Sequence, residues 1–378
     1  MNRPLARMAR LTAVAVSASF LFGSVALAQD TNASQTRFNP EMKLNNQPAK
    51  GRYVTLPPRL FSELARPALS SSSLQTWNGS YSYNGSNYTY NMVGADPATN
   101  TSATIPVYII PVKLIIGRRT FDPAHTLSNG NSVTNNTALS PIFDSTTNYN
   151  LGGVNVGTTQ YLDAYQRANF WGTVSSHPSS HVLLGGPTVL AEQTLTVPSA
   201  YGTTGAPFGY TSGLVDINWF DAQLPNLMAK LGIQPNVFPI FLTYDTYLTQ
   251  GGGCCIGGYH SAEGSVSNPQ SYTQASYIDH PGVFAQDVSA LSHEIGEWVD
   301  DPLVVNTNGN QTPCGNLENG DPLENTANYG DYAYSLHGFS YHLQDLATMP
   351  YFGAPASTTV NGWLSFHHAS LGVCSNGS

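Results

Sequence analysis

The chain has 378 residues, and its 14 Lys and Arg against 23 Asp and Glu give a formal net charge of −9. This acidic balance argues against nucleic acid as a partner, because nucleic-acid-binding surfaces are basic. Only 10% of the residues are charged, while Gly, Ser, Thr, Asn and Tyr are abundant, which is typical of a β-rich extracellular protein.

Residues 1–28 have the pattern of a secretory signal peptide. Arg3, Arg7 and Arg10 precede an apolar run that closes with an A-x-A site ending at Ala28. The run is short for a bilayer span, and no later segment has the roughly 18 apolar residues that a membrane helix needs. We therefore expect cleavage after Ala28 and a secreted mature protein, extracellular or periplasmic, with no membrane partner.

A polar arm and a β-rich region are expected next. Residues 29–75 are polar and rich in Pro and Ser, which predicts an N-terminal arm. The β-rich region covers residues 76–215. Within it, Asn84-Gly85 between alternating aromatic and polar residues predicts a hairpin, and the apolar run over 105–116 predicts a buried strand. Apolar residues at helical spacing predict a helix within 158–174.

The last region, residues 216–378, shows a helix, strand, loop, strand and helix pattern. A helix is predicted over 219–231 with Gly232 after it, and a strand over 237–248, with a shorter strand beginning at Gln274. Apolar residues at 3, 4, 3 spacing then predict an amphipathic helix over about 284–299, which a proline at position 302 ends. Whether this region shares one domain with residues 76–215 is left open.

Charge is distributed unevenly along the chain. Residues 231–378 contain thirteen Asp and Glu but no Lys or Arg. A half-chain of this composition repels itself, so its compact folding is easier to explain if it binds cations.

The stretch "LSHEIGEWVDDP", from Leu291 to Pro302, contains an H-E-x-x-E motif on the last predicted helix. Because an α-helix has 3.6 residues per turn, His293 and Glu297 project from one face and could hold one ion. Glu294 lies about 100° around the helix, where it can act on a water at that ion without binding the ion. The alternative is an ordinary solvated helix face.

Further ligands have to come from other segments. The stretch "CGNLENGDPLE" supplies Glu318, the first choice as third ligand, and Asp321, a further ligand or an orienting group. An acidic surface loop is the alternative for this stretch. His260 is a candidate ligand or oxyanion donor, and Tyr259 beside it is a second candidate oxyanion donor.

Four cysteines lie in the acidic half, and export permits disulfides. A bridge between Cys254 and Cys255 would be strained, so each is expected to pair with Cys314 or Cys374, and both patterns stay open. A metal–thiolate cluster is the alternative, although no C-x-x-C spacing supports it.

The motif residues resemble those of the plant exordium or phosphate-induced protein family and of uncharacterised secreted bacterial relatives. The resemblance covers about residues 235–374 and depends on His293, Glu294, Glu297, Pro302, Glu318, Gly320 and Asp321. The chain departs from the family pattern at Asp301, Asn319 and Leu323, where Asn is expected at the first and a cysteine at the last. The family's helix is similar to that of zincin metallopeptidases. The expected fold is therefore α+β, a β-rich N-terminal part followed by a zincin-like region with an H-E-x-x-E active-site helix.

These features favour a secreted, zincin-like, metal-dependent hydrolase that acts on peptides or proteins, with Glu294 as general base. His293, Glu297 and Glu318 would bring two negative charges to a divalent ion, which makes it a weaker Lewis acid than in an H-E-x-x-H site. Zinc is the first expectation for the metal; if Asp321 also binds, calcium or manganese become alternatives. The alternative function is a non-catalytic extracellular or cell-wall-associated binding protein with a structural ion.

Overall fold

The computed structural model describes residues 49–61, 73–83, 85–306, 317–324, 326–355 and 365, all within the unit formed by residues 38–378. The expected signal peptide and most of the polar arm lie outside the described residues. Among the described helices, none has the length and apolarity that crossing a membrane requires. The chain combines helices and strands, which confirms the expected α+β class.

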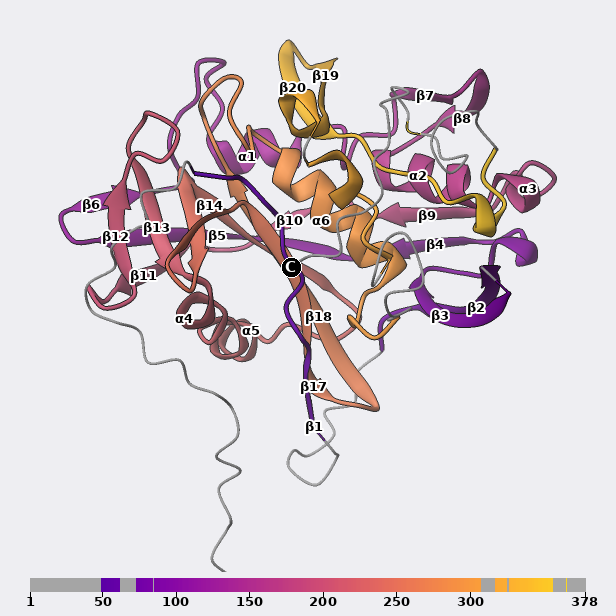
Figure 1. The fold of residues 1–378 in the computed structure, drawn as a ribbon, viewed down its shortest axis with the longest axis horizontal. Helices are drawn as coiled ribbons and strands as arrows, with labels where there is room; N and C mark the ends of the chain where they lie inside the picture. The colour runs from indigo at the N-terminus through magenta and orange to yellow at the C-terminus, as the bar shows by residue number, and fades with distance from the viewer. Residues whose placement is uncertain are drawn as a thin grey trace, which may run out of the picture. The chain divides into compact units, whose positions relative to one another are not determined.

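An eight-stranded sheet forms the centre of the fold, and its strands come from both the β-rich and the acidic region (Figure 1). Most neighbouring pairs are parallel, but β17 with β18 and β5 with β6 are antiparallel. The path runs through β1 (Arg59–Phe61), β17 (Gly258–Ser265), β18 (Asn268–Tyr277), β14 (Phe238–Tyr244), β5 (Val107–Ile116) and β10 (Thr188–Val189), and β6 (Arg119–Phe121) and β11 (Gln193–Val197) also pair with β5.

Smaller sheets surround this centre. A four-stranded sheet contains β12 (Gly202–Gly205), β13 (Ser212–Asp216), β15 (Thr246–Gln250) and β16 (Gly253–Ile256). The two-stranded sheets are β2 (Thr76–Tyr83) with β3 (Ser86–Val93), β4 (Ser102–Ile105) with β9 (His181–Leu184), β7 (Asn148–Leu151) with β8 (Val154–Thr158), and β19 (Asp331–Leu336) with β20 (Phe339–Gln344). The α-helices are α1 (Val133–Ala138), α2 (Tyr161–Asn169), α3 (Trp171–Val174), α4 (Ile217–Asp221), α5 (Leu224–Leu231) and α6 (Ser289–Asp300).

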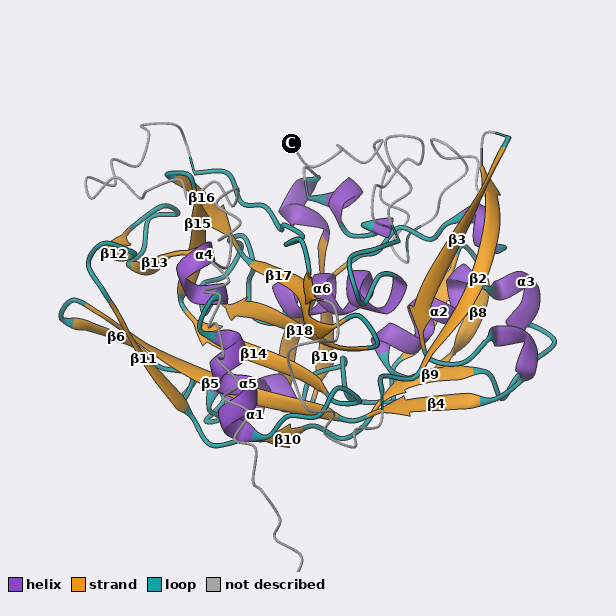
Figure 2. Cartoon of the chain, turned by 90° about the horizontal axis from the view of Figure 1, so that it is seen from below, coloured by secondary structure: helices purple, strands orange, loops and turns teal. Residues whose placement is uncertain are grey.

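Helices cover both faces of the central sheet (Figure 2). On one face, Trp298 of α6 stacks on Phe238 with ring centroids 3.8 Å apart and joins a core that includes Ile109. On the other face, Phe220 of α4 packs in a second core with Ile110. Because side chains alternate along a strand, the neighbours Ile109 and Ile110 face different helices. The same rule decides which residues of β17 face α6.

Several predicted elements are confirmed with altered boundaries. The hairpin forms as β2 and β3, and the apolar run forms the buried strand β5. The helix predicted over 219–231 is divided into α4 and α5, since Pro225 lies in the first turn of α5, a position that proline favours. Helix α5 ends at Leu231, and Gly232 follows it as predicted, with φ of 65°. The strand predicted over 237–248 divides into β14 and β15 at Asp245, whose φ of 43° interrupts the extended backbone.

Helix α6 differs from its prediction in two respects. It begins at Ser289 rather than near residue 284, because Ala285 and Asp287 have positive φ values of 61° and 40° that no helix accommodates. All twelve of its residues are buried, so its polar face is not the solvated face of an amphipathic helix. That polar face carries the H-E-x-x-E motif.

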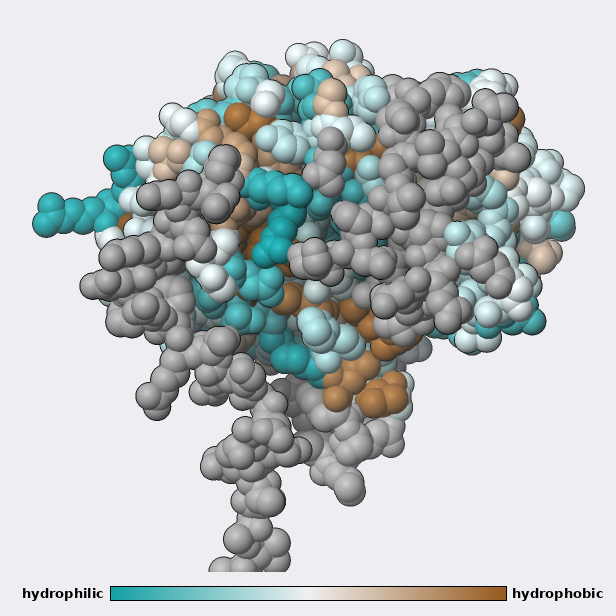
Figure 3. Space-filling view, viewed as in Figure 1, coloured by the Kyte–Doolittle hydropathy of each residue, from teal (hydrophilic) through white to brown (hydrophobic). Residues whose placement is uncertain are grey.

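The N-terminal segment 49–61, which we call the covering segment, packs across this part of the molecule. It lies in the range expected to form a polar arm, yet Tyr53 is only 4% exposed and Leu56 only 8%. In Figure 1 its indigo trace passes beside α6 and continues along β17 as β1. Figure 3, drawn from the same side, shows hydrophilic residues along the middle of this face.

The disulfide pattern corrects the sequence-based expectation. Cys254 and Cys255 are bonded to each other rather than to Cys314 or Cys374, which lie outside the described residues. The peptide bond between the two neighbours is cis, and their Cα atoms are 3.1 Å apart. The expectation that Cys254 and Cys255 pair with distant cysteines is therefore wrong.

Candidate metal centre

The structure brings all predicted site residues together except Tyr259. His293, Glu294 and Glu297 lie on α6, His260 lies on β17, and Glu318 and Asp321 lie in the loop 317–324. Two overlapping groups of potential metal ligands result, each with its ligand atoms within 4.8 Å of one another. One group is His293, Glu297 and Asp321, and the other is His260, Glu294 and Glu297.

The imidazole of His293 presents an unprotonated nitrogen to carboxylates. The side-chain amide N–H of Gln344 donates to the Tyr329 carbonyl at 3.0 Å, so its Oε1 accepts a hydrogen bond from Nδ1–H of His293. His293 Nε2 therefore carries a lone pair. This Nε2 lies 2.9 Å from Glu297 Oε1 and 3.9 Å from Asp321 Oδ1 but has no hydrogen-bond partner. Two acceptors this close repel each other unless a proton or a metal ion lies between them, so the pair can hold a metal ion in place of a proton.

Gly320 allows the loop 317–324, which we call the acidic loop, to approach α6. A Cβ at this position would lie 2.2 Å from Nδ1 of His293, which is closer than real Cβ contacts come. The backbone N–H of Gly320 also points to Glu297 Oε1, at 3.4 Å. The loop thus packs directly on the imidazole, and the residues on either side of it supply Glu318 and Asp321.

Burial dominates the electrostatics of the four acidic residues at this place. It is the largest cause of the pKa values of Glu294, Glu297, Glu318 and Asp321 being well above their usual range. The charges of neighbouring carboxylates raise these pKa values further, whereas the hydrogen bond with Glu318 lowers that of Glu297. Glu297 and Glu318 share a side-chain hydrogen bond, which requires a proton on one of them. A divalent cation would replace that proton and allow the carboxylates to ionise.

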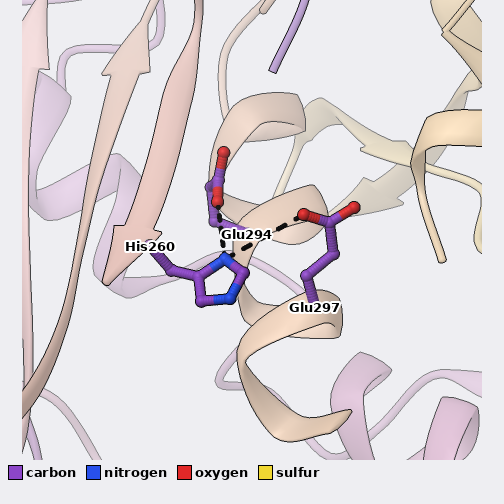
Figure 4. A group of neighbouring side chains, drawn as sticks. All are labelled: His260, Glu294 and Glu297. Carbon is purple, nitrogen blue, oxygen red and sulfur yellow. Dashed lines mark hydrogen bonds and ion pairs between the residues drawn. The ribbon is translucent and has the colours of Figure 1, made fainter. Parts of the chain in front are cut away.

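His260 and Glu294 form a buried pair beside this centre (Figure 4). His260 Nδ1 lies 3.3 Å from Glu294 Oε2 and 4.0 Å from Glu297 Oε2. Burial, followed by the electrostatic effect of the neighbouring His293, lowers the pKa of His260 to about 3, so the ring is neutral and Nδ1–H can donate to Glu294. Glu294 Oε1 has no partner, and Gly258 leaves space for it, because a Cβ there would lie 2.9 Å away. One oxygen of Glu294 is thus oriented while the other is available.

Tyr259 is directed to the opposite face of the sheet. Its hydroxyl donates to Asp221 Oδ1 at 2.9 Å, as the hydroxyl of Tyr272 does at 2.7 Å. Because side chains alternate along β17, a strand that directs His260 toward α6 directs Tyr259 toward α4. We therefore leave Tyr259 out of the proposed site.

Two residues of the site were missed by the sequence analysis, Tyr53 and Gln344. The ring of Tyr53 stacks on the imidazole of His293 with centroids 3.9 Å apart and an interplanar angle of 26°. Gln344, at the end of β20, accepts a hydrogen bond from Nδ1–H of the same imidazole and so orients the ring. Neither residue belongs to a local pattern, so no signal in the sequence marks them.

A cavity of about 460 Å³ lies next to the centre. Aromatic, acidic and imidazole side chains line it, among them Tyr277, Asp287, Tyr329, Asp331 and His342. Ser289 connects the two places, because its hydroxyl donates to Asp331 Oδ1 at 2.6 Å and lies 3.2 Å from the Tyr53 hydroxyl.

Comparisons of this chain with protein-family models, with curated proteins and with solved structures found no match. The resemblance to the exordium family therefore stays a prediction, and function has to be argued from the geometry of the site.

Proposed function

We propose that this protein is a secreted, zincin-like, metal-dependent hydrolase that cleaves peptide bonds. The observation that carries the proposal is the buried, unprotonated Nε2 of His293, which faces a carboxylate oxygen of Glu297 at 2.9 Å without a hydrogen bond. The proposed ligand set is His293, Glu297, Asp321 and Glu318. One imidazole nitrogen with carboxylate oxygens suits zinc, and calcium or manganese are the alternatives.

Glu294 is the proposed general base. When bound, the ion would supply a Lewis acid that polarises the substrate carbonyl and acidifies a water. Glu294 Oε1, which has no partner, would accept the proton of the attacking water while the water oxygen forms a bond to the carbonyl carbon. The C–N bond then breaks, and Glu294 returns the proton to the leaving amine. His260 is a positioning residue that holds Oε2 of Glu294.

A non-catalytic protein with a structural ion is the second candidate function. The observation that favours it is burial, because His260, His293 and Glu294 have no exposed surface beneath the covering segment. Such a protein would use other surfaces to bind cell-wall material or a protein partner. The two candidates differ in what Glu294 does once metal is bound.

Glu294→Gln separates the two candidates. Metal content and hydrolysis of a peptide library are measured for the full chain, in the native sequence and in a Tyr53→Ala background that loosens the covering segment. The hydrolase proposal expects Glu294→Gln to retain the metal and the melting temperature and to lose hydrolysis. Glu192→Gln, which changes a carboxylate that pairs with Lys113 away from the site, is the matched control and should change neither.

Three results would contradict the hydrolase proposal. Undiminished turnover in Glu294→Gln would exclude Glu294 as the base. Metal binding without hydrolysis in either background would favour the structural ion. Two equivalents of metal would indicate that His260 and Glu294 hold an ion themselves, since they form the second ligand group with Glu297.

A further inference from the structure

The covering segment is held by backbone hydrogen bonds to the edge of two sheets. Arg52 forms a parallel bridge with Ile256 of β16, in which Arg52 N–H donates to the Cys255 carbonyl at 2.9 Å and Gly257 N–H donates to the Arg52 carbonyl at 3.1 Å. Further along, β1 adds to the edge of β17 in parallel, with Arg59 opposite Glu263. Most of these contacts use the backbone, so they do not depend on the identity of the side chains.

Tyr53 and Thr55 are the residues of this segment that contact proposed metal ligands. The ring of Tyr53 stacks on His293, and its backbone N–H donates to Glu324 Oε1 at 2.6 Å. Two positions later, the hydroxyl of Thr55 donates to Glu318. The segment therefore contacts one proposed metal ligand by stacking and a second by a hydrogen bond.

Glycines on both sides make the fit close. A Cβ on Gly51 would lie 2.2 Å from the ring of Phe284, and a Cβ on Gly257 would lie 2.9 Å from the ring of Tyr53. Because neither glycine has a side chain, the covering segment packs closely on the residues beneath it. This contact leaves no space for a second polypeptide at the same place.

The charges of the segment complement those of the site. The half of the chain that contains the acidic loop has no Lys or Arg, whereas Lys50 and Arg52 flank Tyr53 on its N-terminal side. The Arg52 guanidinium donates to Oε1 of Gln250, at the end of β15, at 3.2 Å, and both cations oppose the effect of burial on the pKa of Glu324. A basic residue directly before an aromatic one is therefore the pattern that this surface accommodates.

An exposed sheet edge with a pocket for one side chain is how proteins bind extended peptides in general. We propose that the edge of β16 and β17 beside the metal centre is a binding site for an extended polypeptide with a basic residue followed by an aromatic residue, and that residues 50–56 occupy it within the molecule. The inference rests on the proposed function for its biological meaning, since the bound polypeptide would be the substrate. It also implies that the covering segment limits access to the metal centre.

Binding of a synthetic peptide tests the inference without requiring catalysis. The probe is a fluorescently labelled peptide with the sequence of residues 49–61, and all proteins are full-length chains in a Glu294→Gln background. Protein with Tyr53→Ala should bind the probe, while protein with the native segment should bind it at least about tenfold more weakly, because its own segment competes. A probe with the Tyr53→Ala change should bind weakly to both. Pro57→Ala, at an exposed position of the segment, is the matched control and should behave as the native chain does.

A second protein keeps the test decisive if Tyr53→Ala does not fold. A site-specific protease recognition sequence inserted between Ser71 and Ser72 allows the folded chain to be cut behind the covering segment, with every native side chain retained. After the cut, the probe should exchange with the segment, and the Tyr53→Ala probe should not. Failure of the probe to bind either protein, or equal binding to the native and altered chains, would overturn the inference. Probe binding without any hydrolysis in the chain that retains Glu294 would instead count against the proposed function alone.

Discussion

Gly320→Ala tests whether the acidic loop packs on the imidazole of His293 and so completes the metal centre. The added Cβ would lie 2.2 Å from Nδ1 of His293 and 2.6 Å from Oε1 of Gln344. Because non-bonded carbon contacts are about 3.5–4.0 Å, the ring or the loop has to move by roughly 1 Å. Metal sites tolerate ligand displacements of only about 0.2 Å, so we expect this change to disturb the site strongly.

The expected magnitude has two parts. Loss of the hydrogen bond from His293 to Gln344 should weaken metal binding by about 10- to 100-fold, as is common when a group that orients a metal ligand is lost. The steric overlap should also lower the free energy of unfolding by about 1–3 kcal/mol. Isothermal titration with zinc measures the first effect, and urea unfolding in the presence of a chelator measures the second without the metal.

Gly186→Ala is the matched control, because a Cβ at Gly186 meets no atom within 4 Å. It should change neither the metal affinity nor the unfolding midpoint. If Gly320→Ala keeps the metal affinity of the native chain, the loop does not abut His293 and the proposed ligands from it are refuted.

Two other substitutions test the surroundings of the site. Tyr259→Phe should leave hydrolysis unchanged, because the Tyr259 hydroxyl donates to Asp221 on the far face of β17. It should lower the free energy of unfolding by about 1 kcal/mol. A loss of activity at unchanged stability would show that Tyr259 belongs to the site. Burial raises the pKa of Asp300 to about 7. The folded protein therefore keeps this proton at pH values where the unfolded chain has lost it, and the free energy of unfolding falls as the pH rises from about 4 to about 7. The fall is about 4 kcal/mol at most. Asp300→Asn should therefore reduce the fall in urea midpoint between about pH 5 and about pH 8, and identical pH profiles for the two proteins would contradict this assignment.

Local geometry explains which parts of the site could be predicted from the sequence. His293 and Glu297 are one helical turn apart, and the turn fixes their proximity wherever the helix lies. The acidic loop could be proposed because it follows α6 closely and has few other ways to satisfy its carboxylates. The buried strand β5 was likewise predictable, since a continuous apolar run that is hydrophobic on both faces suits the centre of a sheet.

The remaining features depend on contacts between distant parts of the chain. Tyr53 reaches His293 only because β1 joins the edge of β17, and Gln344 reaches it only because β20 lies beside α6. Strand order in a sheet is not encoded in any local period, so neither contact could be predicted. The direction of Tyr259 is different: alternation predicts that it and His260 face opposite sides, and applying that rule to the sequence would have excluded one of them.

The proposed function explains why residues 231–378 have many carboxylates and no Lys or Arg. Two kinds of positive charge would compensate these carboxylates. A divalent ion at His293 can neutralise two of the buried carboxylates, which leaves the others to find different partners. Lys50 and Arg52 of the covering segment favour the ionised form of Glu324, because they lower its pKa. Both residues come from the N-terminal part of the sequence. In the proposed function, one partner would be an inorganic ion and the other belongs to a segment that a substrate could replace. A lysine or arginine fixed within residues 231–378 would compete with both, so the absence of these residues there is consistent with a site that must exchange its cationic partner.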